Sequence, residues 1–175
     1  MKSKILNRLR GAEEFVSGQQ LCEEFGVSRT AVWKAINQLK EEGYEIEAIQ
    51  NKGYCLKDVP DVLGESEIKS RLHTRWAGQT LYYYDEIDST NTQIKRLAEE
   101  DAPHGTLAVA DYQSRGKGRR GRAWDSPHGS AIYMSILFRP EIRPDRASML
   151  TLVIGLSVTQ AIRSNLGLQA QIKWP

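Results

Sequence analysis

LCEEFGVSRTAVWKAINQLKEEGYEIEAIQNKGYCL, residues 21–56, is the stretch of sequence that decides the fold of the first part of the chain. Ser28 is a favourable helix N-cap, and apolar residues follow it at spacings of three and four, the period of a helix that faces a core. These apolar residues are Val32, Ala35, Ile36 and Leu39. We therefore predict a helix from residue 28 to about Gly43, followed by two strands, residues 44–49 and 54–57, with a turn at residues 51–53.

Two more helices are predicted before this stretch. Ile5, Leu6 and Leu9 give the first helix its apolar side. Ser17 followed by Gln20 is a capping-box pattern that begins the second helix, and the glycine at position 26 ends it. Three helices and a hairpin within residues 1–58 are the plan of a winged helix-turn-helix domain.

The rest of the chain is predicted to be a mixed α/β domain. Residues 59–66 form a linker, because Pro60 cannot continue the preceding strand. Strands are predicted at residues 80–84, 107–110, 131–138 and 171–174, and helices around residues 65–72, 89–101 and 147–165. This interleaving predicts a domain over residues 67–175, so the whole chain is of the α/β (α+β) class.

The composition is that of a soluble globular protein, with 175 residues of which 40% are hydrophobic and 26% charged. The longest apolar stretch, residues 149–158, is too short for a membrane span, which needs roughly 20 residues. Cys22 and Cys55 make neither a disulfide framework nor a zinc site, and His73, His104 and His128 lack metal-ligand spacing. We therefore expect a reduced, cytoplasmic protein with no membrane partner and no metal site of its own.

The charge is concentrated in one place. Five cations, Arg115, Lys117, Arg119, Arg120 and Arg122, fall within eight residues that contain no acid. The interleaved glycines let backbone N–H groups approach a ligand, so this segment is expected to bind an anion. A disordered nucleic-acid-binding tail is the alternative, but the flanking strands and the nearby Trp124 favour a loop that orders over a ligand. The glycine spacing excludes a Walker A loop.

The helix over residues 28–39 has a polar side that could read DNA. Its candidate DNA-binding residues, together with a lysine at the tip of the hairpin, are Ser28, Arg29, Thr30, Lys34, Asn37 and Lys52. Arginine and asparagine can read base edges, while lysine and threonine serve phosphates. An amphipathic helix with a solvated polar side remains the alternative, since residues 1–60 hold nine basic and nine acidic residues.

Small polar residues gather where a strand meets a helix, at Asp88, Ser89, Thr90 and Asn91. Helix capping explains Ser89 alone, but Ser89, Thr90 and Asn91 in a row, together with Gln113, could also hold a compact polar ligand. Lys173 lies in a strand-like run, where a lysine is either an edge-strand charge or the partner of an anion.

These motifs resemble one family. The run over residues 21–56 is similar to the DNA-binding domain of the bifunctional biotin protein ligase/repressors of the BirA type. DSTN at 88–91, YQSRGKGRRGRAW at 112–124 and IKWP at 172–175 resemble, in that order, the catalytic core of biotin protein ligases.

The resemblance implies an ATP-dependent, AMP-forming ligase. Biotin and ATP would give biotinyl-5'-AMP, and the biotin would pass to a lysine of the biotin carboxyl carrier protein of acetyl-CoA carboxylase. It also implies a biotin-responsive repressor that binds operator DNA as a homodimer when adenylate is bound, and Mg²⁺ that accompanies ATP.

The resemblance also assigns site residues. Those expected to bind biotin are Ser89, Thr90, Asn91, Gln113, Lys117, Gly118, Arg119 and Lys173. Those expected to bind the adenylate are Arg119, Arg120, Arg122 and Trp124. The residues expected to act in catalysis, by neutralising charge at the phosphate, are Lys117, Arg119 and Lys173.

Some points depart from the family or stay open. The family loop commonly has arginine where Lys117 stands. Lysine keeps the charge but loses the bidentate fork of arginine, so we expect weaker retention of the adenylate. The chain ends at Pro175, before segments expected of a complete catalytic domain, so we expect a fragment, and a chain that ends there would be a poor enzyme or none. The alternative function is a DNA-binding regulator with a remnant ligase domain as biotin sensor. Ligation of lipoate or octanoate is a weaker reading.

Overall fold

The computed structural model describes residues 1–173, with the side chain of Arg119 left out. The chain divides into two compact units, Met1–Phe138 and Arg139–Pro175. Each unit is described by itself.

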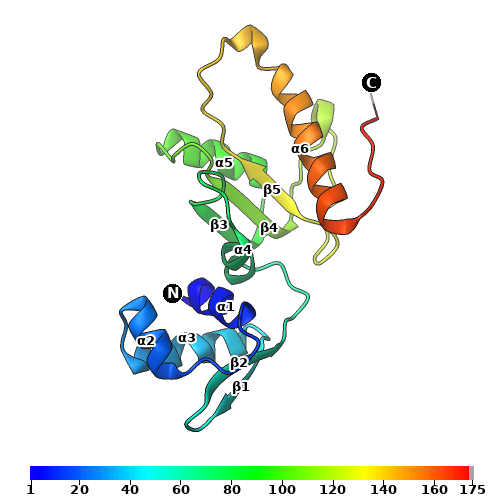
Figure 1. Cartoon of the computed structure of the whole chain (residues 1–175). Coiled ribbons are helices and arrows are strands. Elements are labelled where there is room, and N and C mark those ends of the chain that lie inside the picture. Colours follow the sequence, from blue (N-terminus) through cyan, green and yellow to red (C-terminus); the bar gives the residue numbers. More distant parts are fainter. Residues whose placement is uncertain (174–175) are drawn as a thin grey trace. The chain divides into compact units, whose positions relative to one another are not determined.

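The first unit begins with three helices and a hairpin (Figure 1). The helices are α1 (Lys2–Arg10), α2 (Gly18–Phe25) and α3 (Arg29–Glu41), and the hairpin pairs β1 (Glu45–Ile49) with β2 (Gly53–Asp58). Their core contains every apolar residue that the helical spacing selected, namely Ile5, Leu6, Leu9, Val32, Ala35, Ile36 and Leu39. A fully buried leucine or isoleucine contributes about 1.5–3 kcal/mol, so this core stabilises the domain. The predicted helices and hairpin are confirmed.

The predicted helix starts are also confirmed at the level of hydrogen bonds. Ser17 Oγ accepts from the Gln20 backbone N at 3.1 Å, and the Gln20 side chain accepts from the Ser17 N at 2.9 Å, which completes a capping box. Ser28 Oγ accepts from the Ala31 N at 3.2 Å. α2 ends at Gly26, which has the left-handed φ of 64° that glycine adopts without strain.

The hairpin is joined to the connection between α1 and α2. Val16 and Tyr54 exchange two backbone hydrogen bonds of 2.9 Å. A Cβ on Gly53 would lie 2.1 Å from the Val16 carbonyl oxygen, so only glycine permits this approach at the start of β2. The position of the hairpin beside the helices therefore depends on the glycine that begins β2.

A fourth helix, α4 (Glu65–Arg71), follows the proline-containing segment and packs against α1. Arg10 Nη2 and Nη1 donate to Glu67 Oε2 and Ser70 Oγ, both at 2.7 Å, and the Tyr44 hydroxyl donates to Glu67 Oε2 at 2.9 Å. The helix was predicted, but its polar contacts with α1 and with Tyr44, the residue before β1, were not. The domain limits at residues 58 and 66 stay a prediction.

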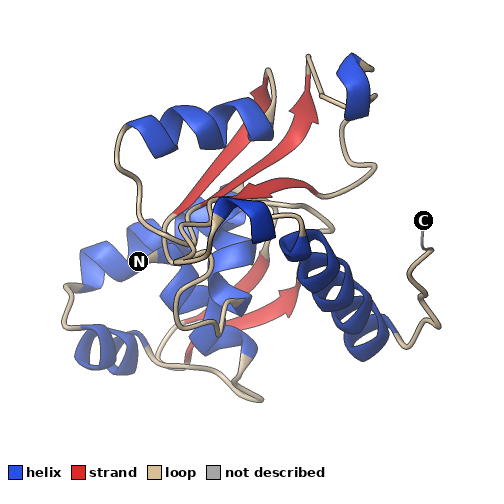
Figure 2. Cartoon of the chain, turned by 90° about the horizontal axis from the view of Figure 1, so that it is seen from above, coloured by secondary structure: helices blue, strands red, loops and turns tan. Residues whose placement is uncertain are grey.

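A three-stranded sheet completes the first unit. Its order is β3 (Leu81–Ile87), β4 (Leu107–Gln113), β5 (Tyr133–Ile136), with β3 parallel to β4 and β5 antiparallel to β4. The helix α5 (Thr90–Glu99) connects β3 to β4 and lies along one face of the sheet (Figure 2). Ile94 and Leu97 of α5 pack with Ala108 and Leu137 in a second core. Since β3 and β4 are parallel, the segments that follow them start from the same edge of the sheet.

The second unit contains the short 3₁₀ helix η2 (Pro144–Arg146) and the helix α6 (Met149–Leu166), which confirms the helix predicted there. The strand predicted at residues 171–174 is wrong for residues 171–173, which have no regular secondary structure. Arg163 Nε donates to the Ala170 carbonyl at 2.8 Å, which ties the segment before them to α6 instead of to a strand. Residue 174 lies outside the described residues. Among the described helices, none is long and apolar enough to cross a membrane.

Candidate functional site

The junction between β3 and α5 places two small hydroxyl side chains in the interior. Ser89 is 1% exposed and Thr90 is 4% exposed. Ser89 stands at the N-cap position of α5, but its side chain makes no capping hydrogen bond. The capping explanation of Ser89 is therefore wrong. Asp88 Oδ1 instead accepts from the Ser89 N at 2.8 Å, and Asp88 Oδ2 forms an ion pair with Arg96 Nη2 at 2.7 Å. The hydrogen bond from Arg96 lowers the pKa of Asp88.

A network of hydrogen bonds links this junction to the end of β4. We call it the buried network because Thr90 and Ser126 are buried, while Gln113 and Ser135 are half-buried. Thr90 donates from its backbone N and from Oγ1 to Gln113 Oε1, at 2.8 Å and 3.1 Å. Gln113 Nε2 donates to Ser126 Oγ at 3.0 Å, and Ser135 Oγ lies 3.0 Å from Thr90 Oγ1. The structure thus brings together Thr90 and Gln113, which the sequence singled out, with Ser126 and Ser135, which it did not.

The basic segment is an ordered hairpin and not a disordered tail. Two backbone hydrogen bonds join its two sides: Trp124 N donates to the Gly116 carbonyl at 2.9 Å, and Gly118 N donates to the Arg122 carbonyl at 2.8 Å. Arg115 N donates to the Asp88 carbonyl at 2.8 Å. A short 3₁₀ helix, η1 (Arg119–Gly121), forms its tip. We call residues 115–124 the basic hairpin.

Gly116 closes the base of the basic hairpin. A Cβ there would lie 2.3 Å from the Trp124 carbonyl oxygen and 2.8 Å from Ser126 Oγ. The backbone of the basic hairpin therefore starts directly against Ser126 of the buried network.

The cations of the basic hairpin are open to solvent. Lys117, Arg120 and Arg122 are exposed, and the Trp124 side chain is 61% exposed. A pocket of about 460 Å³ is lined by Gly118, Arg120, Arg122, Ala123 and Trp124. The side chain of Arg119, named for biotin, adenylate and catalysis, lies outside the described atoms.

Two other candidates are exposed and make no hydrogen bond within the buried network that the structure gives. Asn91 is exposed on the first turn of α5, and Lys173 is exposed in the second unit. Their roles stay predictions.

The candidate DNA-binding residues lie on α3 and the hairpin. Arg29, Thr30 and Lys34 are exposed, and Asn37 is half-buried. Arg29 Nη2 donates to Gln19 Oε1 at 3.0 Å. A cavity of about 450 Å³ is lined by the first residues of α2, by Arg29 and by residues 48–54, which include Lys52. Two cations from different elements therefore border one groove, while Ser28 uses its hydroxyl to cap α3.

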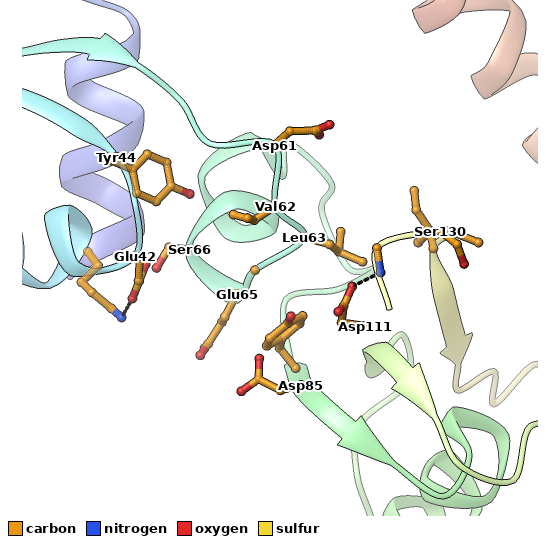
Figure 3. A pocket seen from close by; sticks show the side chains of 16 residues that line it. Glu42, Tyr44, Asp61, Val62, Leu63, Glu65, Ser66, Asp85, Asp111 and Ser130 are labelled. Carbon is orange, nitrogen blue, oxygen red and sulfur yellow. Dashed lines mark hydrogen bonds and ion pairs between the residues drawn. The ribbon is translucent and has the colours of Figure 1, made fainter. Parts of the chain in front are cut away.

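A larger cavity, about 900 Å³, lies elsewhere in the first unit (Figure 3). Its charged lining is mostly acidic, with Glu42, Asp61, Glu65, Asp85 and Asp111. Burial and then the carboxylates of Asp85 and Asp111 raise the pKa of Tyr83 in its wall to about 12. A cavity with these charges does not suit an anion such as a nucleotide phosphate.

Comparisons with known proteins match both parts of the chain. A family described as HTH domain matches residues 2–55, and the biotin/lipoate A/B protein ligase family matches residues 83–175. The bifunctional ligase/repressor BirA of Bacillus spizizenii is 46% identical over 166 residues, which are 95% of this chain and 51% of that protein. The Escherichia coli protein of the same name is 36% identical over 163 residues, 93% of this chain and 49% of that protein.

A solved structure, of biotin protein ligase from Aquifex aeolicus in complex with biotin and ATP, is 38% identical to the chain. It matches 55% of this chain and 40% of that chain, with a TM-score of 0.48. The chain spans about half the length of the curated relatives it matches. Because the ligase family matches more than half of the residues, including the buried network and the basic hairpin, the chain belongs to the biotin/lipoate A/B protein ligase family.

Proposed function

We propose that the protein is a biotin protein ligase and a biotin-responsive transcriptional repressor. Its ligase activity would form biotinyl-5'-AMP from biotin and ATP and transfer the biotin to a lysine of the biotin carboxyl carrier protein of acetyl-CoA carboxylase. The observation that carries this proposal is the contact between the buried Thr90–Gln113 network and the basic hairpin. Membership of the ligase family and the likeness to curated ligase/repressors support it.

The buried network suits an uncharged polar ligand. Ser89, Thr90 and Gln113 offer hydroxyl and amide groups without a charge, which match the neutral donors and acceptors of a ureido ring. Asn91, exposed on the next helical position, would contribute a further amide at the rim. Binding in a buried site strengthens such hydrogen bonds, because little water competes for them.

The basic hairpin suits the reacting end of the ligand. A biotin carboxylate oxygen would attack the α-phosphorus of ATP, forming a carbon–oxygen–phosphorus link while pyrophosphate leaves with the electron pair of the broken bond. Lys117, Arg119 and Lys173 would neutralise the charge at the phosphate. Gly118 would let the backbone of the basic hairpin approach the ligand, while its N–H donates to the Arg122 carbonyl. Arg120, Arg122 and the exposed Trp124 would cover the adenylate.

The second step needs a nucleophile from the acceptor protein. The acceptor lysine, as a free amine, would attack the biotinyl carbonyl, so that an amide forms and AMP leaves. Mg²⁺ would accompany ATP by binding its phosphates. Across the part of the chain that the structure describes, no group of three acidic, histidine or cysteine side chains could hold a metal ion.

The repressor activity rests on the first three helices and the hairpin. α3 would lie in the major groove of operator DNA with Arg29, Thr30, Lys34 and Asn37, while Lys52 would reach a neighbouring phosphate. The Ser28 hydroxyl caps α3, so Ser28 would contact DNA mainly through its backbone. A homodimer formed when adenylate is bound would span two half-sites, and a cytoplasmic location fits both activities.

Formation of biotinyl-AMP tests the ligase proposal against a regulator that only senses biotin. Purified protein is mixed with biotin and α-labelled ATP, and labelled biotinyl-AMP is separated and counted. We expect formation by the wild type and a loss of at least tenfold in Gln113→Ala, with Gln160→Ala, an exposed glutamine on α6, as the matched control. Biotin binding without any adenylate would contradict the ligase and favour the sensor.

A further inference from the structure

Residues 126–130, which follow the basic hairpin, are held along β4 by side chains that the proposed reaction does not use. Asp111 Oδ2 accepts from His128 Nδ1 at 2.8 Å. Its Oδ1 accepts from the Gly129 N at 3.0 Å, the hydrogen bond drawn as a dashed line at Asp111 in Figure 3. The hydrogen bond from His128 lowers the pKa of Asp111. One carboxylate on β4 therefore holds two consecutive residues of this segment, which we call the latch.

Aromatic and hydroxyl groups hold the same segment from other directions. The ring of Tyr112 stacks on that of His128, with centroids 4.7 Å apart and planes 15° apart. Ser130 Oγ and the Tyr133 hydroxyl both donate to the Pro127 carbonyl, at 2.9 Å and 3.1 Å. The latch is thus fixed at Pro127, His128 and Gly129, between the end of β4 and the start of β5.

The first residue of the latch belongs to the buried network. Ser126 is 1% exposed. Its Oγ donates to the Trp124 carbonyl at 3.3 Å and accepts from Gln113 Nε2 at 3.0 Å, while the Gln113 N donates to the Ser126 carbonyl at 3.3 Å. Ser126 is therefore the point where the latch, the base of the basic hairpin and the candidate biotin site meet.

This arrangement determines which way the Gln113 amide faces. A carbonyl oxygen only accepts, so the Ser126 hydroxyl must donate to Trp124 and accept from the Gln113 NH₂ group. At the other end, the Thr90 backbone N can only donate, so the Gln113 oxygen must face it. Both ends require the same orientation. The Gln113 oxygen is then saturated by two donors of Thr90, and one N–H remains for a ligand.

We propose that the latch positions Gln113 for biotin, with Ser126 and Asp111 as positioning residues, so that Gln113 acts only as a hydrogen-bond donor to the ligand. This inference rests on the proposed biotin site. Removing the Ser126 hydroxyl would free the amide to turn over. Removing the Asp111 carboxylate would release the latch and the base of the basic hairpin with it.

Hydrogen exchange of the ligand-free protein tests the latch without any use of biotin. We expect Asp111→Leu to speed exchange at the Gly129 and Trp124 amides several-fold, and Asp111→Asn to restore protection because its amide oxygen can still accept from Gly129. Asp125→Leu changes an exposed acid next to the latch and is the matched control. Unchanged exchange in Asp111→Leu would overturn the latch.

Calorimetric titration then tests its effect on the ligand. One lost hydrogen bond is worth roughly three- to tenfold in affinity, so we expect Ser126→Ala to weaken biotin binding by that factor and to leave ATP binding unchanged. Ser114→Ala, a serine beside the basic hairpin, is the control. A wild-type protein that does not bind biotin contradicts the proposed function. If the wild type binds biotin and both Ser126→Ala and Asp111→Leu bind it equally well, the role of the latch is contradicted but the proposed function is not.

Discussion

The absence of a Cβ at Gly116 lets the base of the basic hairpin pack against Trp124 and Ser126. Its backbone lies so close to the Trp124 carbonyl and the Ser126 hydroxyl that an alanine Cβ would lie only 2.3 Å and 2.8 Å from them. The carbonyl belongs to the backbone and cannot turn aside. An alanine must therefore break the 2.9 Å hydrogen bond from Trp124 N to Gly116 or move the latch.

We predict that Gly116→Ala lowers the free energy of unfolding by about 1–3 kcal/mol, the usual cost of forcing an atom into packed space. It should also make the basic hairpin more sensitive to trypsin, which cleaves after its lysine and arginines. Urea unfolding and timed proteolysis measure both effects. Gly11→Ala is the control, because the nearest atom to its Cβ is 3.7 Å away and its φ is −82°. Equal stability of the two variants would contradict the prediction.

At the scale of elements, one carboxylate holds α4 to α1 and to Tyr44, the residue before β1. The Glu67 side chain is 13% exposed and accepts hydrogen bonds from Arg10, Tyr44 and Arg71, which come from three different segments. Burial raises its pKa, but the hydrogen bonds from Arg71, Tyr44 and Arg10 outweigh burial, so the net pKa of Glu67 is lowered. The proton is therefore bound more weakly in the folded than in the unfolded protein.

We predict that Glu67→Gln lowers the free energy of unfolding by about 1–3 kcal/mol at pH 7, because buried partners lose a charged acceptor. A lowered pKa stabilises the fold above the unfolded value of about 4.3 and loses that effect as the pH falls through the folded value. The difference between wild type and variant should therefore shrink below about pH 4. Denaturant unfolding between pH 3 and 7 tests this.

Glu65→Gln is the matched control on the same helix. Glu65 is 55% exposed and pairs with Lys69 four residues later, an arrangement worth only about 0.3–0.5 kcal/mol. A loss in Glu67→Gln no larger than that in Glu65→Gln would mean that α4 is not held by this carboxylate.

The proposed DNA-binding helix, α3, gives a second prediction at this scale. Lys34 is exposed on α3, where a lysine serves phosphates rather than bases. We expect Lys34→Ala to weaken binding to operator DNA and to unrelated DNA alike. The slope of log Kd against the logarithm of the salt concentration should fall by about one. Fluorescence anisotropy at several salt concentrations measures it. Lys40→Ala, in the last turn of α3, is the control, and equal effects of the two would place Lys34 outside the interface.

The elements also show what the sequence could and could not predict. Helix starts at Ser17 and Ser28 depend on hydrogen bonds three residues away, so a local pattern was enough to find them. Ser126 bonds Gln113 from 13 positions away in the sequence, and Ser135 bonds Thr90 from 45 positions away. The fold of the sheet brings these side chains together. No periodicity encodes that. Residues 171–173 have the composition of a strand, but the described chain gives them no strand partner.

At the scale of the whole molecule, ligase and repressor would share one ligand. If biotinyl-AMP favours the form that binds operator, the two binding events have a coupling free energy, and this coupling must act in both directions. Operator DNA would then hold biotinyl-AMP more tightly by the same factor by which biotinyl-AMP tightens operator binding. A ligase and a DNA-binding domain that merely share a chain would have no such reciprocity.

We predict that biotin and ATP together tighten operator binding by about 5- to 150-fold, the usual range of such coupling. Operator DNA should raise the affinity for biotinyl-AMP by the same factor. Anisotropy of labelled operator measures the first effect, and equilibrium dialysis of labelled biotinyl-AMP the second. DNA that carries a single half-site is the control, because a homodimer gains its advantage from two half-sites. Tight operator binding that is the same with and without biotin and ATP would contradict the coupling. A ligand that binds two states with equal affinity does not change the equilibrium between them.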